Sequence, residues 1–202
     1  MCFVELANLL NRGEPKMKKL LFVAMTTAII SSCASNDFVQ IPTEVKGMVF
    51  NDIGSTYLER PTRAYLIDYP DGSKSLEYVV ESYRMQAGSP VGIALKIQEK
   101  NVSEHLAAFN KFLDWDKLAK QRKDNFTKEI AIVPTTNGYN VYAFHSGNKN
   151  TNVLVSCFSM TNSSGCGYDA ITFTPQNVHR IIKEAEMLKN KTLKPVDTSI
   201  YQ

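Results

Sequence analysis

The order of the expected secondary structure elements is the feature that most constrains the fold. Segments with strand-like patterns are followed by one amphipathic helix, and this order occurs twice. The clearest strand pattern is 91–98, where four apolar residues alternate with small or polar ones. Pro70 to Ser73 and Asn137-Gly138 are turn sequences between strand-like segments, and each predicts an antiparallel hairpin. The expected strands are 46–53, 63–69, 75–85, 91–98, 128–133, 139–145, 152–160 and 167–173.

Both helices have start signals in the sequence. Asn101 is predicted to cap a helix over about 102–123, with Glu104 as its capping-box partner. The aromatic stripe of this helix is expected to pack into the core. Thr174 as N-cap and Pro175 at the first helical position predict a second helix that ends near residue 190.

Together these patterns predict an α+β fold. We expect one domain over 45–190, with an antiparallel sheet or sheets of about eight strands and two helices. The elements suggest two ββββα halves, 45–123 and 127–190. Ala94, Asn101 and Val102 align with Ala170, Asn177 and Val178, which is compatible with duplication and equally with chance similarity. Two arrangements stay open: one continuous sheet with both helices on one face, or two stacked units.

A short apolar segment near the N-terminus follows two cations. Lys18 and Lys19 precede the apolar run 20–30, which is too short to span a bilayer, and Ser31, Ser32 and Cys33 come next. This stretch, Met17 to Cys33, resembles the lipobox signal of bacterial lipoproteins. An ordinary cleaved signal peptide and a buried apolar helix are the alternatives.

The resemblance implies several features of the whole chain. Residues 1–32 would be a leader and signal peptide, with Met17 a better start than Met1, and Cys33 would carry the lipid. Ala34 and Ser35 in place of an aspartate after the cysteine imply the outer membrane, facing the periplasm. Residues 33–44 are then expected to form a tether, and 191–202 a polar tail.

The four cysteines divide between leader, anchor and domain. Cys2 lies in the leader and Cys33 is the lipid acceptor, so Cys157 and Cys166 remain. In the oxidising compartment that the resemblance implies, these two are expected to form a disulfide across a hairpin, with two free thiols as the alternative. The spacing of His145 and His179 to the cysteines is not typical of metal ligands, and we predict no metal or other cofactor.

Charge argues against a nucleic-acid partner. The chain has 23 basic and 20 acidic residues, without a long basic stripe. The locally basic tract 117–128 is interrupted by acidic residues. It is read as a solvated helix end rather than as a contact with an anionic lipid or polymer.

The sequence carries no established catalytic motif. His145, Ser146, Asp169 and His179 are weak candidates for a Ser/His/Asp hydrolase, which would need them within hydrogen-bond reach. The leading hypothesis is a non-enzymatic, lipid-anchored envelope protein whose periplasm-facing domain binds an envelope protein or peptidoglycan, as an accessory, inhibitor or immunity-type protein. The alternatives are an envelope-polymer hydrolase using His145, Ser146 and Asp169, and a purely structural lipoprotein.

Overall fold

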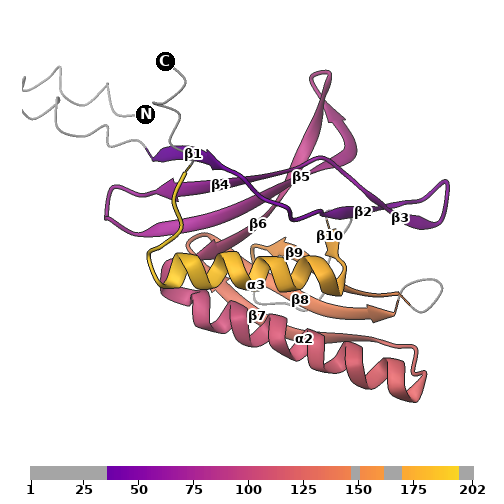
Figure 1. Cartoon of the computed structure of the whole chain (residues 1–202). Coiled ribbons are helices and arrows are strands. Elements are labelled where there is room, and N and C mark those ends of the chain that lie inside the picture. Colours follow the sequence, from indigo (N-terminus) through magenta and orange to yellow (C-terminus); the bar gives the residue numbers. More distant parts are fainter. Residues whose placement is uncertain (1–35, 147–150, 162–169, 196–202) are drawn as a thin grey trace, which may run out of the picture. The chain divides into compact units, whose positions relative to one another are not determined.

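The computed structural model describes residues 36–146, 151–161 and 170–195, which form two antiparallel sheets and two α-helices. The strand order is β1-β4-β5-β6 in the four-stranded sheet and β3-β2-β10-β9-β8-β7 in the six-stranded sheet (Figure 1). The predicted α+β class is therefore confirmed. The elements are β1 (Asp37–Ile41), β2 (Met48–Asn51), β3 (Thr56–Glu59), β4 (Thr62–Asp68), β5 (Lys74–Gln86), β6 (Ser89–Gln98), the 3-10 helix η2 (Glu99–Asn101), α2 (Val102–Arg122), β7 (Thr127–Thr135), β8 (Gly138–Ser146), β9 (Asn152–Ser159), β10 (Ala170–Phe173) and α3 (Pro175–Lys189).

The predicted ββββα halves do not correspond to the two sheets. The described residues contain ten strands rather than eight, because β1 and β3 were not expected. The β2–β3 hairpin also leaves its own half and joins the other sheet, where Met48 of β2 pairs with Thr172 of β10. The chain crosses between sheets at Gly47, where an added Cβ would lie 2.3 Å from a methyl carbon of Val80. Only glycine allows this close approach.

Part of the segment predicted as a tether, 33–44, is a strand. Residues 37–41 form β1, which pairs with β4 from Asp37 opposite Asp68 to Ile41 opposite Ala64. The apolar residues at alternate positions, Val39 and Ile41, explain the difference, because they supply one inward face of a strand. Ile41 is only 3% exposed and belongs to the core.

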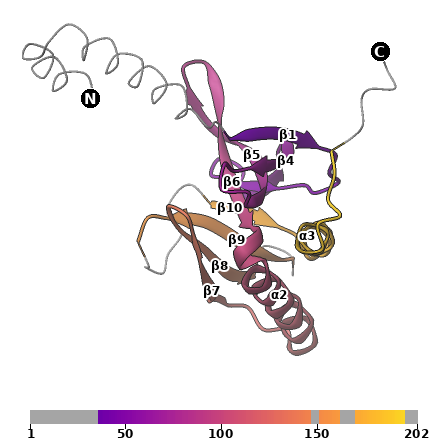
Figure 2. The same ribbon diagram turned by 90° about the vertical axis from the view of Figure 1, so that its left-hand side faces the viewer.

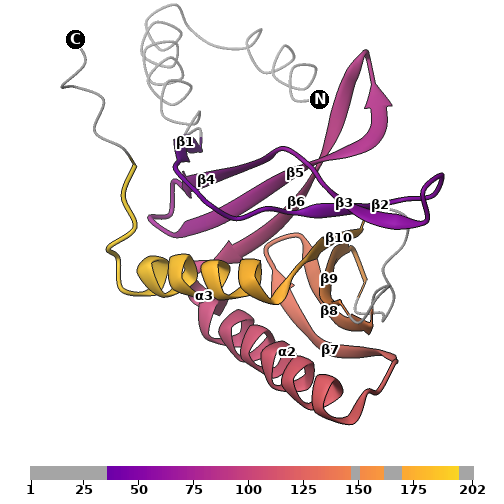
Figure 3. The same cartoon turned by 45° about the vertical axis from the view of Figure 1, so that its right-hand side comes forward.

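Both helices and both sheets share one hydrophobic core. The two helices lie on the same side of the six-stranded sheet, and α3 lies between α2 and the four-stranded sheet (Figures 2 and 3). Phe109 and Phe112 of α2 are fully buried, so the expected core role of the aromatic stripe is confirmed. The architecture matches neither expected arrangement fully, because the helices are shared between two separate sheets. Among the described helices, none is long and apolar enough to cross a membrane.

One of the two predicted helix caps is present. Thr174 caps α3, where its Oγ1 accepts a hydrogen bond from the main-chain N of Asn177 at 3.3 Å. The predicted capping box of α2 is wrong, because the side chain of Asn101 makes no cap hydrogen bond. Asn101 ends η2, and its Nδ2 donates to the carbonyl oxygen of Pro134 at 2.6 Å. The tertiary contact with β7 replaces the local cap.

Candidate functional site

The predicted catalytic residues do not form a triad in the described part of the chain. His145 Nδ1 lies 2.7 Å from Thr127 Oγ1, and Ser146 Oγ accepts a hydrogen bond from the main-chain N of Phe126 at 3.1 Å. His179 is exposed on α3. Asp169 lies outside the described residues. Within those residues, no hydrogen bond joins His145, Ser146 and His179, so the geometry gives the hydrolase hypothesis no support.

The cysteine predictions lie mostly outside the described residues. This applies to Cys33 and to Cys166. Cys157 is disulfide-bonded and lies on β9 opposite Ala170 of β10. The two flanking segments are therefore antiparallel strands, as expected, while the pairing of Cys157 with Cys166 stays a prediction. In the ranges that the structure describes, no group of three or more His, Cys, Asp and Glu side chains could hold a metal ion.

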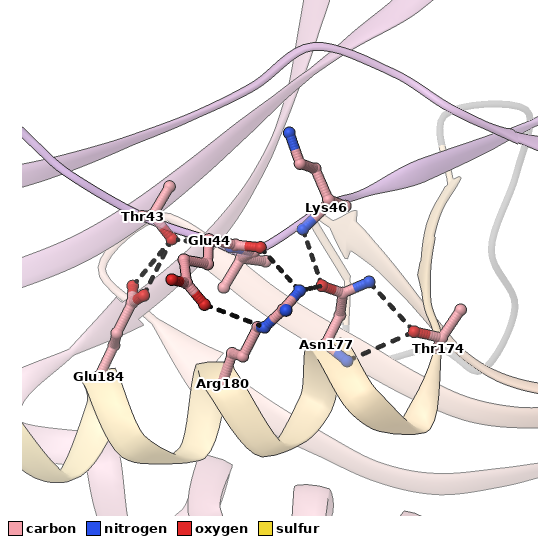
Figure 4. Close-up of polar contacts among 8 residues, drawn as sticks. Thr43, Glu44, Lys46, Thr174, Asn177, Arg180 and Glu184 are labelled. Atoms are coloured by element: carbon pink, nitrogen blue, oxygen red, sulfur yellow. Dashed lines mark hydrogen bonds and ion pairs between the residues drawn. The ribbon is translucent and has the colours of Figure 1, made fainter.

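A polar cluster on α3 holds the connection between β1 and β2 (Figure 4). Asn177 Oδ1 accepts hydrogen bonds from the main-chain N of Lys46 at 2.9 Å and from Arg180 Nη1 at 3.1 Å. Arg180 Nη1 also donates to the carbonyl oxygen of Glu44 at 2.9 Å. Because these contacts satisfy main-chain groups of a crossing segment, the cluster fixes where the chain passes from one sheet to the other.

One carboxyl group of this cluster has a shifted pKa. Glu184 accepts hydrogen bonds from Tyr78 Oη at 2.7 Å and from Thr43 Oγ1 at 2.9 Å. Burial raises the pKa of Glu184, although both hydrogen bonds act in the opposite direction. Burial, followed by the charge of Glu184, raises the pKa of Tyr78 well above its usual range. The sequence did not single out Glu184, because nothing local indicates that a tyrosine from β5 reaches it.

Replacing Asn177 by alanine should lower the free energy of unfolding by about 1 kcal/mol, because the partly buried main-chain N–H of Lys46 and the side chain of Arg180 lose their common acceptor. Chemical denaturation of the purified variant measures this change. Gln176→Ala is the matched control, since Gln176 is an exposed amide on the same turn of α3 and should change stability by less than about 0.5 kcal/mol. Equal effects of the two substitutions would contradict a clamping role for Asn177.

The best candidate for a binding site is a groove of about 420 Å³ between the two sheets. One wall is strand β6, with residues 91–94 and Lys96. The other wall is the β7–β8 turn at 135–137, together with Asn140 of β8 and Phe158 of β9. We call this feature the edge groove, because β6 is an edge strand of the four-stranded sheet.

The edge groove exposes unpaired main-chain groups of β6. Asn140 Nδ2 donates to the carbonyl oxygen of Lys96 at 2.6 Å, so the main chain of Lys96 points away from β5. Main-chain groups of a strand alternate in direction, and those of Gly92 and Ala94 therefore point outward as well. The main chain of Ile93 faces β5 instead. Within the described residues, no hydrogen bond engages the outward groups of Gly92 and Ala94.

The side chains that line the groove have no net charge. Its two charged residues are Lys96 and Glu77, and Lys96 Nζ forms an ion pair with Glu77 Oε1 at 2.7 Å. Phe158 is 48% exposed and adds an apolar surface. Thr135, on the opposite wall, has a buried Oγ1 without a hydrogen-bond partner among the described residues. A groove of this kind suits an uncharged ligand that brings its own hydrogen-bonding groups.

A larger cavity of about 610 Å³ lies between β2 and the bend of β5. It is bordered by Phe50, Ile53 and Tyr83, which are all exposed. The guanidinium of Arg60 lies 4.5 Å from the ring centre of Tyr83 and donates to the carbonyl oxygen of Glu81. The lining combines these apolar groups with Asn51, Asp52, Ser82 and Arg84, and this mixture does not define one class of ligand.

Comparison of the chain with protein-family models, with curated proteins and with solved structures found no significant match. The site must therefore be judged from its own geometry. The sequence predicted β6 as a strand, but the alternation of apolar residues did not reveal that β6 is an edge or what lies opposite it. Pro90 was the available signal, because proline within a strand is typical of an edge.

Proposed function

We propose that this protein is a lipid-anchored protein of the cell envelope that binds a partner protein through the edge groove. The anchor would be Cys33, and the domain would face the periplasm from the outer membrane. The observation that carries the binding proposal is the open edge of β6 at Gly92 and Ala94, because unpaired main-chain groups inside a groove favour association with another chain. A role as an accessory, inhibitor or immunity-type protein fits such a site.

The chemistry of the edge groove favours binding over catalysis. Its described lining contains no histidine or cysteine, and its two ionisable groups, Glu77 and Lys96, pair with each other. A hydrolase would need a nucleophile or an activated water beside a general base. The remaining polar groups are hydroxyls, amides and main-chain atoms, which can bind and orient a ligand. Peptidoglycan is the other partner class that the envelope location suggests, and the following experiment separates the two.

A photoreactive amino acid at Thr136 should cross-link this protein to one partner protein in intact cells. Thr136 is exposed at the rim of the edge groove. His179 is exposed on α3 and serves as the control position. We expect a discrete protein adduct from position 136 and none from position 179, as read by gel shift and mass spectrometry. Adducts to peptidoglycan fragments from position 136, or the same protein adducts from both positions, would overturn the proposed protein-binding site.

A further inference from the structure

We infer that the edge groove takes an extended polypeptide segment of the partner, which adds to the four-stranded sheet as a further strand beside β6. This inference rests on the proposed binding role of the same groove. It specifies the kind of contact: main-chain hydrogen bonds to the outward N–H and C=O groups of Gly92 and Ala94. An added strand would lie about 4.8 Å from β6, the usual spacing of neighbouring strands.

The open part of the edge has a definite end on each side. Pro90 shares the outward direction of Gly92 and Ala94, and it has no N–H group to donate. At the other end, Asn140 occupies the carbonyl oxygen of Lys96. The groups between these two limits are the carbonyl oxygen of Pro90, the donors and acceptors of Gly92 and Ala94, and the N–H of Lys96. Donors and acceptors at alternate residues match one short extended segment, which pairs most fully with Gly92 and Ala94.

The other edge strands are less suited to pairing with a partner. The strand β7 has a register irregularity in its middle, between Glu129 and Ala131, and Pro134 near its end, and both features interrupt an edge. The strand β6 also has a proline, Pro90, and an irregular register with β5, but both precede the regularly paired part that begins at Gly92. The edge strands β1 and β3 have five and four residues, and short edges discourage pairing. The strand β6 has ten residues, and its open part lies inside a groove. The contrast singles out β6 as the site of strand addition.

The groove also restricts the side chains of the partner segment. Because side chains of a strand alternate between two faces, every second residue of the added strand would face the groove lining. That lining offers the partly exposed ring of Phe158, the polar turn 135–137 and an ion pair that is already complete. The partner segment is therefore an uncharged one with apolar or small polar residues, rather than an acidic or basic tract.

The first test uses a phage-displayed library of random linear peptides and the full-length chain in detergent. Peptides selected on the wild type should lose affinity about tenfold or more with Ala94→Pro, which removes one outward N–H and places a ring in the path of the partner. Ala94→Ser keeps the N–H and should bind within about twofold of wild type. Proline is tolerated where the N–H of an edge strand points outward, and circular dichroism checks that the variant is folded.

Hydrogen exchange on the wild-type protein provides a second, independent test. A selected peptide should slow exchange of the Gly92 and Ala94 amides, while the Leu95 amide, which faces β5, should not change. The inference is overturned if no peptide binds, if the bound peptides leave the amides of Gly92 and Ala94 unprotected, or if a folded Ala94→Pro protein binds them unchanged. None of these results would contradict a protein cross-link at Thr136. The cross-link tests whether the groove binds a partner, whereas the peptide and exchange experiments test whether the partner binds as an added strand.

Discussion

Cys33→Ser should transfer the protein from the membrane fraction to the soluble periplasmic fraction. A serine cannot form the thioether that carries the diacylglycerol, so the variant would lose every acyl chain. Each buried methylene contributes about 0.8 kcal/mol to membrane binding, and durable anchoring needs more than one chain. Fractionation together with labelling by an alkyne-bearing fatty acid measures the change. We expect essentially complete release and complete loss of label.

Ser35→Ala is the matched control for this variant. It alters a polar residue just beyond the cysteine and leaves the acceptor thiol in place. We expect the control to stay in the membrane and to keep its label. Membrane retention of Cys33→Ser with an undiminished label would rule out Cys33 as the lipid acceptor. Release of both variants would point instead to a general defect in export or folding.

Acidification from about pH 7 to pH 4 should lower the free energy of unfolding by about 3 kcal/mol through His105 alone. His105 is fully buried on α2, with Nδ1 at 2.7 Å from Tyr142 Oη and no partner for Nε2 among the described residues. Burial lowers the pKa of His105 from 6.5 to about 4. Between these two pH values the unfolded chain binds more protons than the folded one, so stability falls as the pH falls.

Two variants isolate the contribution of His105. The double variant His105→Leu, Tyr142→Phe removes both hydrogen-bonding groups together. Its free energy of unfolding should fall by about 3 kcal/mol less than that of the wild type between pH 7 and pH 4. Tyr142→Phe alone keeps the buried imidazole and should respond to acid as the wild type does. Glu184, whose pKa is raised, acts in the opposite direction, because its contribution to stability is lost as the pH rises. Denaturation curves at several pH values measure how the free energy of unfolding changes with pH. The same change in the wild type, the double variant and Tyr142→Phe would exclude His105 as the sensitive group.

The local features of this fold could be predicted from the sequence. The turn at Pro70 to Ser73 joins β4 to β5, and the turn before Gly138 joins β7 to β8, as expected. Thr174 and Pro175 marked the start of α3 correctly. In each case a few neighbouring residues determine the conformation through φ preferences, side-chain caps and alternation. Such signals operate within one turn or one hairpin.

The long-range features could not be predicted. Asn101 has the sequence of a capping residue, yet its amide binds Pro134 of a strand more than thirty residues later. The β2–β3 hairpin lies in the first half of the chain but pairs with β10 in the second. The edge groove depends on both sheets at once, since Asn140 of one sheet contacts Lys96 of the other. Local propensity carries no information about which strands become neighbours.

The pairing of β2 with β10 has a consequence for the order in which the chain folds. The strand β2 is near the start of the described chain, whereas β10 and α3 are near its end. An isolated two-stranded hairpin is at best marginally stable in water, so β2 and β3 would wait for the C-terminal segment. Residues of β10 and α3 also supply part of the common core. The domain is therefore expected to reach its native state only after β10 and α3 are available, and pairing between segments so far apart in sequence slows folding.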